Sequence, residues 1–579
     1  MKDQRPILLT NTALKVIARA VCTRLHKVLD KLISPHQRGF MKNRRINHNT
    51  MEFFTLVRLF QSHRARVTQP KFQAILMADF TKAFDRISHQ YLRAVFMKMG
   101  FGSDIIRLLT LILEGQVAQL FLNNCEGPRF PLQCGTRQGN PLSPLLFNLA
   151  LEPFLVHLGL NQGLKVMYHN CLLFTMKFHA FADDVNIHLN DIDDYERTAR
   201  VISIYENVSN SKVSAEKSKL IGFHRSYPSF AQAALPYTQS HIKSEQATYL
   251  GILIQGVDWN RFISKLPFMT RQHGYRQLDL ISRALGTNIF VCSKTVYKDL
   301  VQCMTKTELR KIDLCIQRMF PGISPAKLYA RPKKGGYGLI ELLTQLLGHR
   351  AEVIGETLSQ ANGWFIQYLR VKMLHHMAKI LAGNEHTRVL KTGGLHWLQF
   401  LLEKTDIFEK NLHWTFSSNE IHYIRAWREV TYKSTEYDVT KQPYITSEST
   451  LMETVADGWL PRAVAEKVSQ VQYKSLSRKK QEALLPLTPR RFQEICPEVE
   501  SVKRWEKFWK VLYKEEWILR HDLTALHLFN FGSYVPLFDV VGDMSVMRCH
   551  LCLSQTTKDG ILAHIYNQCE TTSIWWQQI

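Results

Sequence analysis

The chain has 579 residues, 45% of them hydrophobic, and 74 Lys and Arg against 50 Asp and Glu give it a formal net charge of +24. This length exceeds a single core and predicts two to four domains, and the apolar content excludes wholesale disorder. The charge indicates a polyanionic partner, either nucleic acid or an anionic membrane surface. Because the amino terminus lacks a secretory signal and no apolar run reaches the ~20 residues of a membrane span, nucleic acid is favoured and no membrane partner is expected.

The spacing of apolar residues predicts alternating helices and strands in the first part of the chain. In chain order, these are helices over 12–31 and 48–62, a strand ending at Asp79, helical stretches over 91–99 and 103–113, a hairpin over 117–132, a buried helix over 141–158, a hairpin over 174–189 and a helix over 193–210. From about residue 255 the strand signals become rare and helical periodicity dominates. Elements in this order predict an α+β fold, an antiparallel sheet with helices on one face.

Two adjacent acids, Asp183 and Asp184, interrupt the apolar and β-branched residues 177–189. A tight turn there would place both carboxylates at the tip of a hairpin. Asp79 follows the apolar run 72–78. Three such carboxylates could hold two magnesium ions, which can clamp the attacking and leaving oxygens of a phosphoryl transfer. The alternative, for an acidic pair alone, is an ordinary solvated turn.

The neighbouring residues resemble the reverse transcriptases of non-LTR retrotransposons of the long interspersed element class. The resemblance rests on blocks in the family's order: Arg5 to Leu9 and residues 32–40 (finger motifs), 77–85 (motif A), 135–148 (motif B), 181–184 (motif C), 214–219 (motif D) and 249–252 (motif E). It implies a right-hand polymerase with fingers, palm and helical thumb, which extends a DNA primer or target on an RNA template with deoxynucleoside triphosphates and two Mg²⁺ ions.

The resemblance also implies roles for single residues. Asp79 and Asp183 would bind both ions, and Asp184 would lie closer to the primer end. Phe84 would lie under the sugar of the incoming nucleotide and exclude a 2′-hydroxyl; the alternative is a core phenylalanine. Asp85 is expected to be structural.

Further residues are candidates for contacting the nucleotide. Gly135 and Gly139 would let the backbone approach a substrate, and Gln138, between them, is a better candidate for contacting the nucleotide or template base than Arg137. Three basic residues could act on the triphosphate or the leaving pyrophosphate, with a solvated side chain as the alternative for each: Arg5 and Lys15 as phosphate ligands and Lys217 as general acid.

A second pattern closes the chain. Cys549, Cys552, His564 and Cys569 form a C-x2-C-x11-H-x4-C set, which suits a tetrahedral zinc site. The other cysteines among the 11 are scattered, which favours a reducing compartment over a disulfide framework. The family resemblance implies the nucleus and cytoplasm.

The predicted domains are fingers and palm (1–254), thumb and connection (255–390), a helical basic region (391–540) and a zinc knuckle (541–579). Within the basic region, residues 503–517 place aromatic side chains on one helical face. They predict either a docked helix with a solvated basic back or an RNA-stacking platform.

Compared with full-length relatives, the chain is expected to lack an amino-terminal endonuclease, and no nuclease domain is expected after the knuckle. The main alternative function is therefore a catalytically silent remnant that binds RNA or DNA. A group II intron maturase is a third option, disfavoured by Phe181 in place of the usual tyrosine. The oligomeric state does not follow from the sequence.

Overall fold

The structure is a computed structural model in which two units are distinguished. Unit 1 comprises residues 1–257 and 363–368, and unit 2 comprises residues 258–362 and 369–579. Within them, the structure describes residues 11–61, 74–122, 125–137, 139–161, 163–168, 171–222, 236–238, 240–241, 247–274, 278, 280–321, 323–332, 336–358, 363–382, 412–431, 472, 474, 477, 538–540, 546–549 and 555–557.

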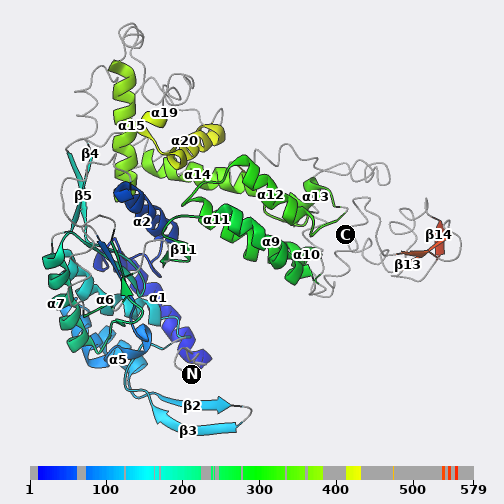
Figure 1. Cartoon of the computed structure of the whole chain (residues 1–579). Helices are drawn as coiled ribbons and strands as arrows, with labels where there is room; N and C mark the ends of the chain where they lie inside the picture. Colours follow the sequence, from blue (N-terminus) through cyan, green and yellow to red (C-terminus); the bar gives the residue numbers. More distant parts are fainter. Residues whose placement is uncertain are drawn as a thin grey trace. The chain divides into compact units, whose positions relative to one another are not determined.

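Unit 1 mixes helices and strands (Figure 1). Its elements are α1 (Thr12–Leu32), α2 (Ile46–Gln61), β1 (Ala74–Ala78), α3 (Ala83–Arg86), α4 (His89–Lys98), α5 (Ser103–Leu113), β2 (Val117–Leu122), β3 (Cys125–Pro131), α6 (Ser143–Gly159), β4 (Leu164–Tyr168), β5 (Cys171–Met176), β6 (Phe178–Phe181), β7 (Asp184–Leu189), α7 (Ile192–Ser209), β8 (Lys219–Gly222), β9 (Ser240–His241), β10 (Thr248–Tyr249) and β11 (Ile252–Leu253).

The central sheet has the strand order β6-β7-β1-β8-β9. Strand β1 pairs antiparallel with β7 on one side and with β8 on the other, whereas β9 runs parallel to β8. The residues of β1 are almost entirely buried, as expected for a central strand covered on both faces. The predicted antiparallel sheet is therefore present, apart from its last, parallel strand.

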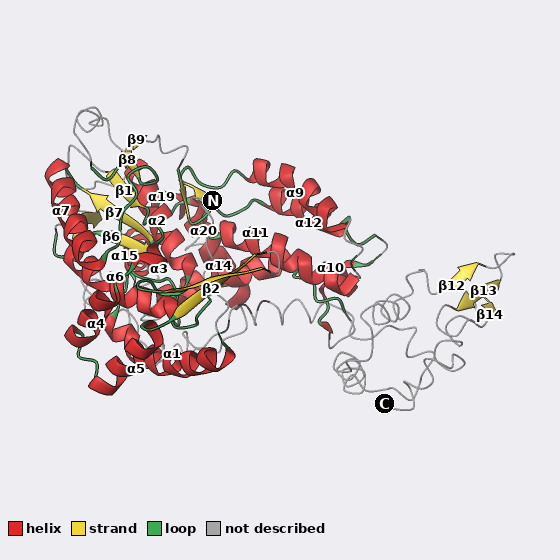
Figure 2. Ribbon diagram, turned by 90° about the horizontal axis from the view of Figure 1, so that it is seen from below, coloured by secondary structure: helices red, strands yellow, loops and turns green. Residues whose placement is uncertain are grey.

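Helices α4, α6 and α7 lie alongside this sheet (Figure 2). Helix α6 is buried over most of its length, with Leu149, Ala150 and Leu151 inaccessible to solvent, which explains why its sequence is apolar on all sides. Helix α7 begins at Asp191, whose side chain accepts a hydrogen bond from the Asp194 N–H at 2.7 Å. Asp191 thus caps the amino-terminal end of α7.

The hairpin of the acidic pair is shorter than predicted. Its strands are β6 and β7, whereas residues 174–176 belong to β5, which pairs with β4. Lys177 separates β5 from β6. Its ammonium group forms a buried ion pair of 2.6 Å with Asp194 of α7. Because β5 and β6 are both apolar, the sequence shows no interruption at Lys177, and the prediction joined them into one strand.

The described part of unit 2 is largely helical. Its elements are α9 (Trp259–Gly274), α10 (Leu280–Thr287), η2 (Asn288–Cys292), α11 (Ser293–Asp299), α12 (Lys306–Gln317), α13 (Pro325–Tyr329), α14 (Leu342–Leu358), α15 (Trp364–Ala382, whose first turn lies in unit 1), α19 (Leu412–Thr415), α20 (Ser418–Thr431), β12 (Phe538–Val540), β13 (Val546–Cys549) and β14 (Gln555–Thr557).

The last three elements of unit 2 form a small antiparallel sheet in the order β12-β13-β14. The helical prediction for residues 391–540 is therefore wrong for Phe538–Val540. The predicted aromatic helix over 503–517 lies outside the described residues. Among the helices that the structure describes, none is long and apolar enough to cross a membrane.

Removing one partner of the Lys177–Asp194 ion pair should destabilise the fold strongly, because the side chains are 3% and 0% exposed and the remaining charge would stay buried. Lys177→Met leaves a buried carboxylate uncompensated and is expected to lower the free energy of unfolding by about 3–5 kcal/mol. The matched control is Arg197→Met, since Arg197 lies 3.8 Å from the same carboxylate but is 38% exposed; it should cost less than about 1 kcal/mol. Urea unfolding of both variants measures the difference, and equal losses would contradict the assignment.

Candidate active site

The pairing of β1 with β7 brings the acids of motifs A and C together. The last pair in this register is Ala78 with Val185. Asp79 follows Ala78 and Asp184 precedes Val185, so the two acids are neighbours at the same end of adjacent strands. Both are exposed, and neighbours across a strand pair place their side chains on the same face.

The third acid lies in the turn between β6 and β7. Phe181 pairs with Asp184, which leaves Ala182 and Asp183 as the two turn residues. Asp183 is half-buried, and Ala182 adopts a left-handed conformation with φ 56°. The predicted tight acidic turn is therefore present, with one of its acids in the turn and the other at the start of β7.

Motif D fixes the backbone of Asp79. The Asp79 N–H donates to Ser218 Oγ at 3.0 Å, and the Asp79 carbonyl accepts from the Ser214 N–H at 2.8 Å. Ser218 is completely buried, and its N–H donates to the Ser214 carbonyl. Residues 214–218 therefore set the direction in which the motif A strand leaves the sheet.

Gly135 of motif B lies against the backbone that follows motif A. A Cβ at Gly135 would lie 2.7 Å from the Asp85 carbonyl oxygen, so this glycine lets two segments of the protein approach each other closely. Its N–H donates to the Ile87 carbonyl at 2.8 Å. Gly139 also has positive φ, 93°, whereas Gln138 lies outside the described residues.

Arg137 is directed into the protein. Its guanidinium donates to the Leu113 carbonyl at 2.9 Å, at the end of α5, where a cation complements the helix dipole. Burial lowers the pKa of this guanidinium. Arg137 thus connects the motif B loop to the end of α5.

Phe84 packs beside motif B while remaining half-buried. Its ring lies 4.5 Å from the ring of Phe147, at an interplanar angle of 30°, and 6.4 Å edge-on from Phe40. These contacts fix the ring, and its partial exposure leaves part of it accessible. The arrangement accommodates both interpretations, a core residue and a platform beneath a sugar.

The basic candidates are spread over the chain. Lys15 is half-buried on α1, Lys217 is exposed in the motif D turn, and Arg5 lies outside the described residues. Their roles toward a triphosphate therefore stay predictions.

The three acids fit magnesium by their chemistry, because carboxylate oxygens are the ligands that this hard cation takes. Two come from neighbouring strand ends and one from the adjoining turn. In the described part of the chain, no three His, Cys, Asp or Glu side chains are already gathered as a metal site. The fit thus rests on the donor set and on the register of the sheet.

The zinc set is described at one position only. Cys549 is the last residue of β13, and Cys552, His564 and Cys569 lie outside the described residues. The zinc knuckle stays a prediction.

A buried polar cluster beneath the hairpin was not predicted. Arg38 donates two hydrogen bonds of 2.7 Å to the Glu52 carboxylate, and His179 Nε2 of β6 lies 3.6 Å from it. Although burial opposes ionisation, the Arg38 guanidinium and His179 lower the pKa of Glu52 to about 2. The signal available in the sequence was an acid within the apolar stretch of α2.

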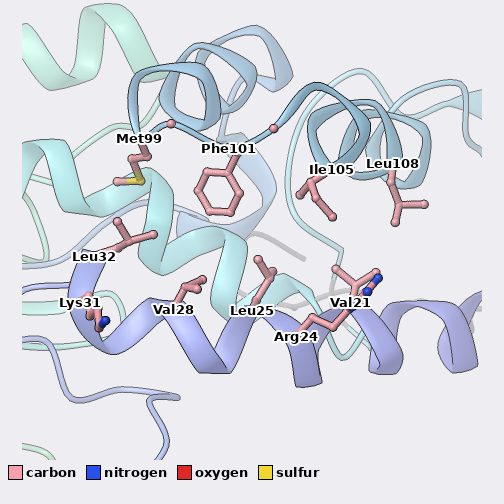
Figure 3. A pocket seen from close by; sticks show the side chains of 12 residues that line it. Val21, Arg24, Leu25, Val28, Lys31, Leu32, Met99, Phe101, Ile105 and Leu108 are labelled. Atoms are coloured by element: carbon pink, nitrogen blue, oxygen red, sulfur yellow. The ribbon is translucent and has the colours of Figure 1, made fainter.

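A cavity of about 430 Å³ lies in another part of unit 1 (Figure 3). It is lined by residues of α1 and of the α4–α5 region: Val21, Arg24, Leu25, Val28, Lys31, Leu32, Met99, Gly100, Phe101, Gly102, Ile105 and Leu108. None of the three acids lines it, so this cavity is not the site at the sheet edge.

A mainly antiparallel sheet with acids at neighbouring strand ends, a glycine loop before a buried helix, and helices packed on the sheet agree with the arrangement predicted for a polymerase palm. Residues 1–254 match the family described as reverse transcriptase (RNA-dependent DNA polymerase). This match covers the predicted fingers and palm, and the relatives that follow are proteins of transposable elements.

The chain is 27% identical over 370 residues to the transposon TX1 uncharacterized 149 kDa protein of Xenopus laevis, covering 61% of this chain and 27% of that protein. It is 29% identical over 184 residues to the retrovirus-related Pol polyprotein from type-2 retrotransposable element R2DM of Drosophila melanogaster, covering 32% and 16%. The chain thus spans about a quarter or less of the length of these relatives.

Among solved structures, the chain is similar to telomerase from Candida tropicalis in complex with a fragment of telomeric RNA. The TM-score is 0.27 at 11% identity, over 53% of this chain and 55% of that one. A likeness at this level supports no further conclusion.

Burial raises the pKa of Glu152 on α6 to about 7 from its ordinary 4.5, against the opposing effects of the Ser34 N–H and Arg44. The folded chain therefore holds a proton that the unfolded chain has released, so Glu152 destabilises the fold increasingly as the pH rises from about 4.5 to 7. Glu152→Gln removes this dependence. The free energy of unfolding of Glu152→Gln minus that of the unmodified chain should therefore be about 2–3 kcal/mol larger at pH 8 than at pH 5.

Urea unfolding at the two pH values measures this change, and Glu196→Gln, at an exposed position of α7, is the control. A difference that does not vary with pH would show that the buried carboxyl of Glu152 does not titrate in this range.

Proposed function

We propose that the chain is an RNA-directed DNA polymerase, which extends a DNA 3′ end on an RNA template using deoxynucleoside triphosphates. The observation that carries this proposal is the register that makes Asp79 and Asp184 neighbours, with Asp183 in the adjoining turn, within a reverse transcriptase domain. The net charge of +24 supports binding of a template and primer, since cations neutralise backbone phosphates. If the chain derives from a retrotransposon, as proposed, it would act in the nucleus and cytoplasm.

In this proposal Asp79, Asp183 and Asp184 hold the magnesium ions. When bound, two such ions stabilise charge on the attacking and leaving oxygens of the nucleotidyl transfer. The protein would supply Asp79 and Asp184 from neighbouring strand ends and Asp183 from the adjoining turn, with the backbone of Asp79 anchored through Ser214 and Ser218. Phe84, held by Phe147, would support the sugar, and Gly139 and Gln138 would contact the nucleotide.

The alternative is a catalytically silent remnant that uses the same fold to bind RNA or DNA. It is favoured by one observation: in the described residues the acids are not gathered into a group of three. Primer extension by the unmodified protein on an RNA template distinguishes the two, because a remnant would bind the template without extending the primer.

Asp183→Ala is expected to reduce primer extension on an RNA template by more than about 10³-fold, since it removes a carboxylate that would hold the ions. Binding of primer–template should stay within about twofold, because a half-buried turn residue contributes little to the fold. Extension and fluorescence anisotropy measure the two effects. The control is Asp193→Ala, at an exposed position of α7, which should retain activity. Parallel loss of binding and extension by Asp183→Ala would assign this acid to the fold instead.

Phe84→Val tests sugar selection. Removing most of the ring should let ribonucleotides enter, raising their incorporation relative to deoxynucleotides by about 10-fold or more. Single-nucleotide incorporation gives the ratio, and Phe147→Leu, which removes the ring against which Phe84 packs, separates loss of support from loss of the ring itself. Unchanged discrimination in Phe84→Val would make Phe84 a core residue only.

We also propose that Cys549, Cys552, His564 and Cys569 bind one zinc ion. Three thiolates and an imidazole at this spacing suit a closed structural site. Zinc content of the purified protein, compared with that of Cys552→Ser, addresses the proposal independently of polymerase activity.

A further inference from the structure

Residues 34–40, between α1 and α2, run along the outer side of β6; we call them the edge segment. Gln37 pairs with Ala180 in a parallel bridge. The Arg38 N–H donates to the Ala180 carbonyl, and the Ala180 N–H donates to the His36 carbonyl, both at 3.1 Å. Since β6 is the outermost strand of the sheet, the edge segment supplies the partner that this strand lacks on its open side.

The side chain of Gln37 continues this pairing into the catalytic turn. Its Nε2 donates to the Ala182 carbonyl at 3.0 Å, and its Oε1 accepts from the Ala182 N–H at 2.8 Å. The same Oε1 accepts from the Gly39 N–H at 3.0 Å. Gln37 is completely buried, so one amide satisfies both backbone groups of the residue that precedes Asp183.

Gly39 shows how closely the edge segment and the turn approach each other. A Cβ at this position would lie 2.3 Å from the Ala182 nitrogen, which leaves no room for any other residue. The Gly39 carbonyl accepts from Asn148 Nδ2 of α6 at 2.7 Å. The edge segment therefore connects the turn to the motif B helix through consecutive buried hydrogen bonds.

The conformation of Ala182 explains why such support is required. An alanine with φ 56° is strained, and a strained residue persists only where its surroundings define it strongly. With both hydrogen bonds lost, the turn could relax to a less strained form. Because Asp183 follows directly, its carboxylate would then leave the edge that it shares with Asp79 and Asp184.

We propose that Gln37 is a positioning residue for the catalytic turn: its amide holds Ala182 in the left-handed conformation and thereby fixes the direction of the Asp183 carboxylate. The role in catalysis rests on the proposed polymerase function. The contact itself, between a finger segment and the palm hairpin, does not.

The test compares Gln37→Met, which fills a similar volume without either hydrogen bond, with Gln37→Glu, which keeps the oxygen that accepts from Ala182 N–H. Gln37→Met should reduce the rate of single-nucleotide incorporation by about 10- to 100-fold and raise the Mg²⁺ concentration required for half-maximal rate. The Kd for primer–template should not change. Gln37→Glu should fall between Gln37→Met and the unmodified protein.

A destabilised control shows whether the effect is merely structural. Ile202→Ala removes a fully buried side chain of α7, so it should lower stability without altering the Mg²⁺ dependence. The same shift in Mg²⁺ dependence in both variants would overturn the proposal, as would an unchanged dependence in Gln37→Met.

Hydrogen exchange gives a readout that needs no activity. The Ala182 amide should exchange faster in Gln37→Met than in the unmodified protein, relative to the other amides of the β6–β7 hairpin, as measured by mass spectrometry of peptides that span it. If the Ala182 amide exchanged at the same rate in Gln37→Met, the proposed role of Gln37 in holding the turn would be overturned, even if the unmodified protein extends primers. Absence of extension by the unmodified protein, with faster exchange in the variant, would reject the polymerase proposal and keep the role of Gln37 in holding the turn.

Discussion

The register between β1 and β7 is the constraint on which the site depends. It pairs Ala78 with Val185, and only this register makes Asp79 the neighbour of Asp184. A slip by one residue would turn every side chain of one strand to the opposite face, bury an acid and separate the pair. The slip is opposed on both sides of β1, because β8 pairs with it from Ala74 to Met77 and the apolar residues of the strand are buried.

Three carboxylates near one end of a sheet repel each other, because their charges have the same sign. The structure opposes this repulsion through the backbone around the acids. Ser214 and Ser218 bind both backbone groups of Asp79, and Gln37 binds both backbone groups of the residue before Asp183. Asp79 and Asp183 are therefore placed by segments far from them in the sequence, and this placement does not require attraction among the acids themselves.

The sequence predicted those features that repeat along one element. Apolar residues at helical spacing indicated α1, α2, α6 and α7 within a few residues of their limits, and the acidic pair indicated the turn. Features that depend on two distant segments were missed. The start of the β6–β7 hairpin was misplaced because the buried pairing of Lys177 with Asp194 is invisible in a linear pattern. The close approach of Gly135 to Asp85 was missed because the two residues lie fifty positions apart in the chain.

The same distinction separates the candidate catalytic residues from their supports. Asp79 and Asp184 are exposed, and a motif can identify them because their chemistry requires carboxylates at a fixed spacing. Gln37, Asn148 and Ser218 are completely buried, and a buried polar group is tolerated only where it finds a partner.

Here those partners are backbone atoms. Gln37 bonds to Ala182 and Ser218 to Asp79, whereas Asn148 bonds to Gly39 of the edge segment. Two of the glycines with close backbone neighbours behave in the same way, since Gly39 admits Ala182 and Gly135 admits Asp85. Buried motif residues without a reactive group thus mark the places where segments far apart in the sequence meet beside the acids.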